Sequence, residues 1–157
     1  MRDDVVRYMD RSRKYYEAHG YINAYRWAHY ETVPIATLSK PLKDCVITLV
    51  TTAMPDSSFS GEKDRFHIGD MSVTPDSFYT KERFWDKDAT HTDDVSSFFP
   101  IEQLRRLSEE GRIGGLSSRY YCVPTEYSQR CTIEHDAPAV LQSCIEDKVD
   151  AALLIPL

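Results

Sequence analysis

The chain has 157 residues, of which 41% are hydrophobic and 28% are charged, and its formal net charge is −6. This length is sufficient for one hydrophobic core, so we expect a single α/β domain over residues 1–157, with a helix and an aromatic segment in 1–40 and a sheet core in 41–157. The acidic balance, without a long block of one sign, argues against nucleic acid or an anionic membrane as partner. No apolar run approaches the ~20 residues that span a bilayer, and the first residues do not form a signal peptide, so we expect a cytoplasmic protein.

The cysteines are scattered along the chain without a C-x-x-C pair. This pattern is typical of reduced thiols that are buried as small hydrophobic side chains, and a disulfide framework is not expected. The spacings of common metal sites, such as H-E-x-x-H, are missing too, so we expect no metal in this chain. The four cysteines are Cys45, Cys122, Cys131 and Cys144.

The N-terminal part is rich in aromatic residues. Apolar residues among charged ones over residues 5–18 predict a helix that ends near Gly20. The aromatic residues of 21–30 follow directly. We interpret this segment as a packing strap across the core, in preference to a ligand platform.

An almost continuous β-branched and apolar run over residues 45–52 predicts a strand that is buried on both faces and central in a parallel sheet. Residues 53–61 have the composition of a loop at the carboxyl end of that strand, where α/β proteins place their sites. Short aromatic stretches in 65–85 indicate strands or ordered loop.

Two helices and a last strand follow. Pro100 to Gly111 predicts a helix about three turns long, with proline in its first turn and glycine at its end. Asp136 as N-cap and Pro138 in the first turn predict a second helix. This helix leads into a buried strand over residues 149–157, so we expect a three-layer α/β sandwich with a mostly parallel central sheet that is incomplete at its C-terminus.

Three short groups of residues could carry chemistry. His91, Asp93 and Asp94 combine an imidazole with two carboxylates, and either a solvated acidic loop or an acid/base site explains them. Cys131 with His135 could form a thiol nucleophile pair, although capping residues before the second helix explain them better. Residues 114–115 are both glycine, which permits a tight turn or a close backbone approach but does not match a nucleotide-binding fingerprint.

Residues 21–30, 41–53 and 91–114, in this order and spacing, resemble the selenoprotein B family of the glycine, sarcosine, betaine and D-proline reductases, particularly its short D-proline-reductase-like members. The resemblance covers most of residues 15–157. In that family a strand similar to 149–157 is followed directly by selenocysteine or cysteine and then by a Pro-x-Cys-like stretch that opens a helix. The resemblance therefore implies that this chain is truncated just before that position, and that it is inactive as it stands.

The family also implies a function. Its members attack the carbon that bears a substrate's nitrogen, or otherwise cleave a C–N bond reductively, and in some of them a partner subunit holds the substrate through a pyruvoyl group. A chalcogen at the end of a strand and the start of a helix has its anion stabilised, which makes it a nucleophile at neutral pH. By resemblance we expect an oxidoreductase subunit that acts on a small molecule, such as an amino acid or amine, and that forms homo-oligomers. We expect no cofactor within this chain.

The resemblance assigns roles to a few residues. His91, Asp93 and Asp94 match the family's His/Asp segment and would transfer protons or bind a substrate ammonium group. Thr51 and Thr52 match the start of the loop after the first strand, and with Met54 they would line the pocket. Two alternatives stay open: a thiol enzyme that uses Cys131 and His135, and a non-catalytic α/β binding or scaffold protein.

Overall fold

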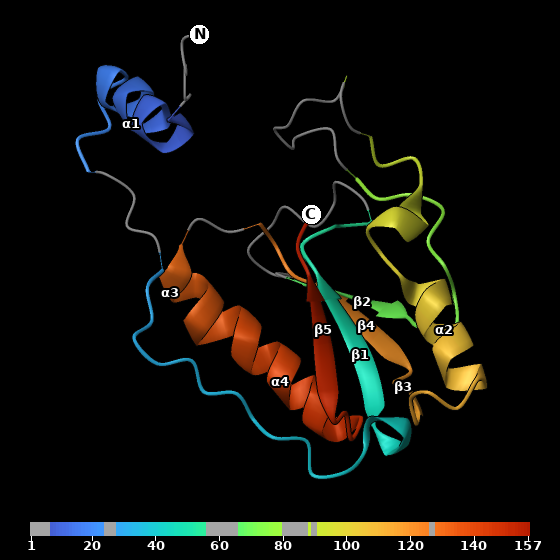
Figure 1. The fold of residues 1–157 in the computed structure, drawn as a ribbon. Coiled ribbons are helices and arrows are strands. Elements are labelled where there is room, and N and C mark those ends of the chain that lie inside the picture. The colour runs from blue at the N-terminus through green and yellow to red at the C-terminus, as the bar shows by residue number, and fades with distance from the viewer. Residues whose placement is uncertain (1–6, 24–27, 56–65, 80–87, 89–90, 126–127) are drawn as a thin grey trace, which may run out of the picture. The chain divides into compact units, whose positions relative to one another are not determined.

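The computed structural model describes residues 7–23, 28–55, 66–79, 88, 91–125 and 128–157 (Figure 1). The chain divides into two compact units, Met1–Ile35 and Ala36–Leu157. The sheet lies wholly within the second unit.

The first unit contains helix α1 (Tyr8–Ala18), which confirms the predicted helix over its described residues. The helix ends at Gly20, whose φ of +87° is readily adopted only by glycine. In the following aromatic segment, the side chains of Tyr21 and Tyr30 are exposed within the first unit. That the segment packs across the core stays a prediction. The contact that Tyr21 makes is local, an edge-to-face packing of its ring on Tyr16 at 5.7 Å between centroids. Tyr25 and Trp27 lie outside the described residues.

The second unit is built on an open sheet of five strands. β1 pairs in parallel with β3 and then β4 along one edge, and in parallel with β5 along the other, while β2 pairs antiparallel with β4. The mostly parallel sheet and the central place of β1 are therefore confirmed. The strands are β1 (Val46–Thr51), β2 (His67–Asp70), β3 (Gly115–Leu116), β4 (Arg119–Cys122) and β5 (Ala151–Ile155).

Helices cover the two faces of this sheet, as Figure 1 shows. α2 (Ile101–Glu109) packs on one face, where its Ile101 and Leu104 join Leu49 of β1 and Tyr120 of β4 in one hydrophobic core. α4 (Ala137–Glu146) covers the other face, and Arg119 of β4 donates a hydrogen bond to the carbonyl of Ser143 in that helix. The predicted three-layer α/β sandwich is thus confirmed, and so is the helix from Pro100 to Gly111.

The start of the second helix differs from the prediction. The chain is helical from Gln129 onward, through α3 (Gln129–Cys131) and the π-helix η4 (Thr132–Asp136) into α4. The cap is Ser128, whose side chain accepts a hydrogen bond from the N–H of Cys131 at 3.3 Å. Asp136 makes no capping hydrogen bond and is buried, so its prediction as N-cap is wrong. The π-turn extends the helix backward past Asp136 to Gln129, so the cap shifts to Ser128, the residue directly before it.

β5 is a strand, as predicted, but it is not a buried one. Leu154 is 71% exposed and Leu153 is 42% exposed. β5 pairs with β1 along one edge, and among the described residues no strand pairs with its other edge. The apolar run was a correct signal for a strand, whereas burial depended on neighbours that the sequence does not reveal.

Candidate functional site

The order of the strands locates the site. After β1 come β2, which pairs with β4 at one edge of the sheet, and then α2 on one face, which leads to β3 and β4 on one side of β1. The chain then returns over the opposite face, through α4, to β5 on the other side of β1. The connections thus diverge between β1 and β5. In open α/β sheets ligands bind at this topological switch point, beyond the carboxyl ends of the strands.

Thr52 and Leu157 meet at the switch point. Thr52 follows β1 directly, and its Oγ1 accepts a hydrogen bond from the N–H of Leu157 at 2.8 Å. The same hydroxyl donates to the carbonyl oxygen of Leu157 at 3.2 Å. A hydroxyl group can do both because it carries one proton and two lone pairs. Thr52 therefore holds the main chain that leaves β5 against the end of β1.

Thr51 and Met54 shape the turn after β1. Thr51 is buried, and its Oγ1 accepts a hydrogen bond from the N–H of Ala53 at 3.1 Å, which closes a tight turn. Met54 is also buried and belongs to the hydrophobic core. Both side chains thus stabilise the turn after β1.

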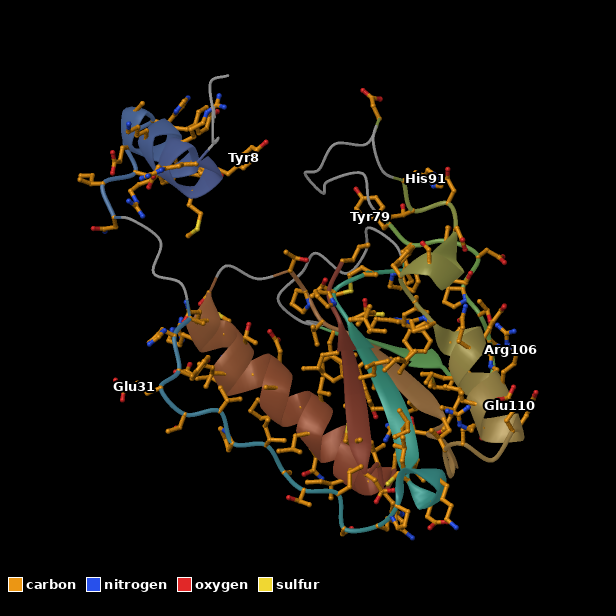
Figure 2. All side chains as sticks on the ribbon, in the orientation of Figure 1. Tyr8, Glu31, Tyr79, His91, Arg106 and Glu110 are labelled. Carbon is orange, nitrogen blue, oxygen red and sulfur yellow. The ribbon has the colours of Figure 1, made fainter. Side chains whose placement is uncertain are left out.

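A second segment is bound to this turn. The N–H of Tyr79 donates to the carbonyl of Met54 at 2.7 Å, and the two residues form an isolated antiparallel bridge. The neighbouring Phe78 packs edge-on against Phe98 and Phe99, with ring centroids 5.8 and 5.2 Å apart. These rings connect the turn after β1 to the segment that carries the His/Asp group. The labelled side chains of Tyr79 and His91 lie at the end of the sheet where β1 ends (Figure 2).

The three residues of the His/Asp group differ in their surroundings. His91 and Asp93 are exposed, with 3.5 Å between Nδ1 and Oδ2, and the backbone N–H of Asp93 donates to the same Nδ1 at 3.3 Å. Asp94 caps the short helix η3 (Val95–Ser97), because its Oδ1 accepts from the N–H of Ser96 at 3.1 Å and from the Ser96 hydroxyl at 2.7 Å. Asp94 therefore has a structural role, whereas His91 and Asp93 face solvent.

The cysteines differ in burial and in the pKa of their thiols. Cys122 is buried in β4, and burial raises the pKa of its thiol to about 12. Burial also raises the pKa of Cys144, and the nearby Asp147 adds to the effect. Cys131 and His135 lie four residues apart in α3 and η4, and among the described residues no hydrogen bond joins this thiol to this imidazole.

In the part of the chain that the structure describes, no group of three or more His, Cys, Asp or Glu side chains could hold a metal ion. Within the same residues no helix combines the length and the apolar character that a membrane span needs.

Sequence reasoning identified the turn after β1 but missed two of its partners. Nothing in the local sequence indicates that Tyr79 pairs with Met54 or that Thr52 binds the backbone of Leu157, since these contacts join distant segments. The apolar run of β5 was the signal for the second contact. It predicted a parallel strand, and the carboxyl ends of parallel strands lie at the same edge of a sheet.

Comparison with family models, with curated proteins and with solved structures found no match to this chain. The case for a function therefore depends on the geometry of the switch point and on the resemblance in sequence.

Proposed function

We propose that this chain forms the N-terminal part of a selenoprotein-B-type reductase subunit, which cleaves a C–N or related bond reductively with a selenocysteine or cysteine placed directly after Leu157. The observation that carries this proposal is the Thr52–Leu157 pair at the switch point. A nucleophile directly after Leu157 would lie at the carboxyl edge of the sheet, where α/β proteins bind their substrates. The resemblance of residues 21–30, 41–53 and 91–114 to that family supports the same conclusion.

The proposed reaction needs an anionic nucleophile and a proton donor for the leaving amine. The selenolate or thiolate attacks the carbon that bears nitrogen, and the leaving amine needs a proton. His91 and Asp93 are the exposed ionisable pair on the segment that the aromatic contacts join to the turn after β1, so they are our candidates for proton transfer or for binding a substrate ammonium group. By resemblance, Thr51, Thr52 and Met54 would line the pocket into which this nucleophile projects.

The proposal includes partners. The substrate is a small molecule of the amino acid or amine class, and a partner reductase subunit could contribute a pyruvoyl group, as the resemblance implies. Self-association is part of the proposal too, because Leu154 of β5 is 71% exposed and Leu141 of α4 is 61% exposed. Exposed apolar side chains of this size favour association between copies.

The test begins with the gene. We expect the codon after that of Leu157 to be UGA or a cysteine codon, with the reading frame continuing beyond it. The subunit expressed with cysteine there, together with its partner subunits and a dithiol reductant, should release amine from glycine, sarcosine or betaine, or open the ring of D-proline. Replacing the added cysteine by alanine should abolish that turnover, with Cys131→Ser as the matched control.

Three outcomes would contradict the proposal. Another stop codon with no downstream frame would favour a binding or scaffold protein. Turnover that survives loss of the added cysteine but not Cys131→Ser would favour the thiol enzyme. Absence of turnover on all four substrates would exclude the known reactions of the family.

A further inference from the structure

We infer that the outer face of α4 is an interface between two copies of this chain, which pack there as an antiparallel pair of helices. The interface lies on the continuous helical stretch that α3, η4 and α4 form over residues 129–146 (Figure 1). The inference makes specific the self-association that the proposed function includes, and in that respect it rests on the proposed function. It needs no reductase chemistry, so association and turnover can be tested separately.

This helix carries its apolar and polar side chains in an inverted arrangement. Its buried residues are polar, since Asp136 is 2% exposed and Ser143, two turns later, is 9% exposed. Its large apolar side chains point away from the sheet, with Ile133 58% exposed and both Leu141 and Ile145 61% exposed. A helix that only covers a sheet has an apolar stripe toward the core and polar side chains toward solvent. The arrangement here is that of a helix with a second apolar neighbour.

The outward apolar residues form a stripe. Pro138 is exposed, Leu141 follows three residues later, and Ile145 lies four residues beyond that. Positions three and four residues apart share one face of a helix. Single exposed apolar residues need no partner, whereas a contiguous apolar patch marks an interaction surface.

The charges of this helix favour a second copy as the occupant. Arg130 lies in the first turn and Glu146 ends α4, with side chains 70% and 56% exposed. When two copies pack antiparallel across a two-fold axis, Arg130 of each copy lies near Glu146 of the other, and Ile133 lies near Ile145. The positive end of each helix dipole then lies beside the negative end of the other. A parallel pair would instead bring like charges together.

The experiment measures the oligomeric state of the whole chain by sedimentation velocity over a wide range of concentrations. Leu141→Ser and Ile145→Ser remove apolar side chains from the stripe. Leu42→Ser is the matched control, because Leu42 is a leucine of similar exposure, 50%, in the short helix η1 (Leu42–Asp44). Leu154→Ser tests association through β5 instead. The melting temperature of each variant verifies that it is folded.

We expect the unchanged chain to form dimers that dissociate on dilution. Leu141→Ser should weaken dimerisation about 100-fold or more, because a few central contacts dominate the affinity of an interface and each substitution acts twice across a two-fold axis. Ile145→Ser should act in the same direction. Leu42→Ser and Leu154→Ser should leave the dissociation constant as it is.

A charge exchange tests the antiparallel arrangement. Arg130→Glu and Glu146→Arg should each weaken dimerisation about tenfold, since each places like charges opposite one another at two symmetric positions. The two changes combined in one chain exchange the charges and should restore the dimer.

Three results would overturn the inference. A chain that stays monomeric at every concentration has no such interface. Dimerisation that persists in Leu141→Ser and is lost in Leu154→Ser would assign the interface to β5. Failure of the charge exchange to restore the dimer would refute the antiparallel pair. Dimers that depend on Leu141, found together with no turnover on the substrates of the family, would support this inference and refute the proposed function.

Discussion

Arg119 of β4 binds Asp147, the residue that follows α4, through two hydrogen bonds of 2.8 Å, one from Nε to Oδ2 and one from Nη2 to Oδ1. The hydroxyl of Tyr121 adds a third hydrogen bond to Oδ2 at 3.2 Å. Such two-pronged contacts between a guanidinium and a carboxylate are among the strongest polar contacts in proteins. Leu141 and Ile145 of α4 are exposed, and the contacts of Asp147 join the end of this helix to β4.

Loss of this contact should destabilise the protein. We expect Arg119→Met to lower the free energy of unfolding by about 2 kcal/mol, because it leaves the partly buried carboxylate of Asp147 without its guanidinium partner. Asp147→Asn should cost less, since Glu146 stays 3.5 Å from the Arg119 guanidinium. Urea denaturation followed by circular dichroism measures the change. Arg106→Met is the control, since Arg106 is exposed on α2, and it should change stability by less than about 0.5 kcal/mol. Equal effects of Arg119→Met and Arg106→Met would show that the contact contributes nothing.

The stability should also fall in acid. The hydrogen bonds from Arg119 lower the pKa of Asp147 below its ordinary value of 3.8, and the hydrogen bond from Lys40 lowers that of Asp150. A carboxyl group with a lowered pKa in the folded state binds fewer protons there than in the unfolded state. Its stabilisation is therefore complete above the ordinary value and is lost as the pH falls through the folded-state pKa.

The urea midpoint measured from about pH 6 to about pH 2 should decline most steeply below about pH 4. In Asp147→Asn combined with Asp150→Asn the curve should be flatter over that range, because two of the carboxyl groups with a lowered pKa in the folded state are gone, whereas Asp70, whose pKa is lowered by hydrogen bonds with Ser72, remains. An equally steep decline in the double variant would mean that other carboxyl groups cause the acid sensitivity.

The paired glycines should respond differently to alanine. A Cβ on Gly114 would lie 2.7 Å from the backbone nitrogen of Cys45, in a close approach that the N–H of Gly114 stabilises by donating to the Cys45 carbonyl at 3.0 Å. A Cβ on Gly115 would meet nothing within 4 Å. We expect Gly114→Ala to cost about 2 kcal/mol of stability and Gly115→Ala to cost little, as measured by urea denaturation. A harmless Gly114→Ala would show that the two backbones can separate freely.

The buried thiol of Cys122 should react slowly with alkylating reagents. Because burial raises the pKa of Cys122 from 9.0 to about 12, its thiolate fraction at neutral pH is about a thousandfold below that of an ordinary cysteine. Timed alkylation with mass-spectrometric mapping should label Cys131, which is partly exposed, well before Cys122. The urea-unfolded chain, in which all four cysteines should react alike, is the control. One cysteine that reacts orders of magnitude faster than a free thiol would identify a nucleophile within this chain.

The residues of the His/Asp group should separate into two classes. His91→Ala and Asp93→Ala should leave stability within about 0.5 kcal/mol, because both side chains are exposed. Asp94→Ala should cost about 1 kcal/mol through loss of the cap on η3, and Asp94→Asn should retain most of it. In the full-length subunit the first two changes should lower turnover about 100-fold or more. Near-normal turnover with an intact fold would show that this segment is an exposed loop before α2 without a role in turnover.

Local patterns in the sequence were sufficient for some elements. The β-branched run over 45–52 predicted β1, and proline at the start with glycine at the end predicted α2. These signals succeed because strand and helix preferences, caps and turns act over a few neighbouring residues. For the glycine pair at 114–115 the sequence left a tight turn and a close backbone approach open, and the structure shows the close approach at Gly114.

Other features depended on the tertiary structure. Thr52 and Leu157 are 105 residues apart, and Arg119 and Asp147 are 28 apart, so their contacts arise only when strand register and helix packing bring them together. The burial of Asp136 and the exposure of Leu154 have the same origin, since burial is decided by neighbours from elsewhere in the chain. The sequence by itself thus determined which segments become strands and helices and that β1 lies at the centre. Only the tertiary structure decided which side chains meet at the carboxyl edge of β1 and β5, because a contact between distant residues depends on the geometry of everything folded between them.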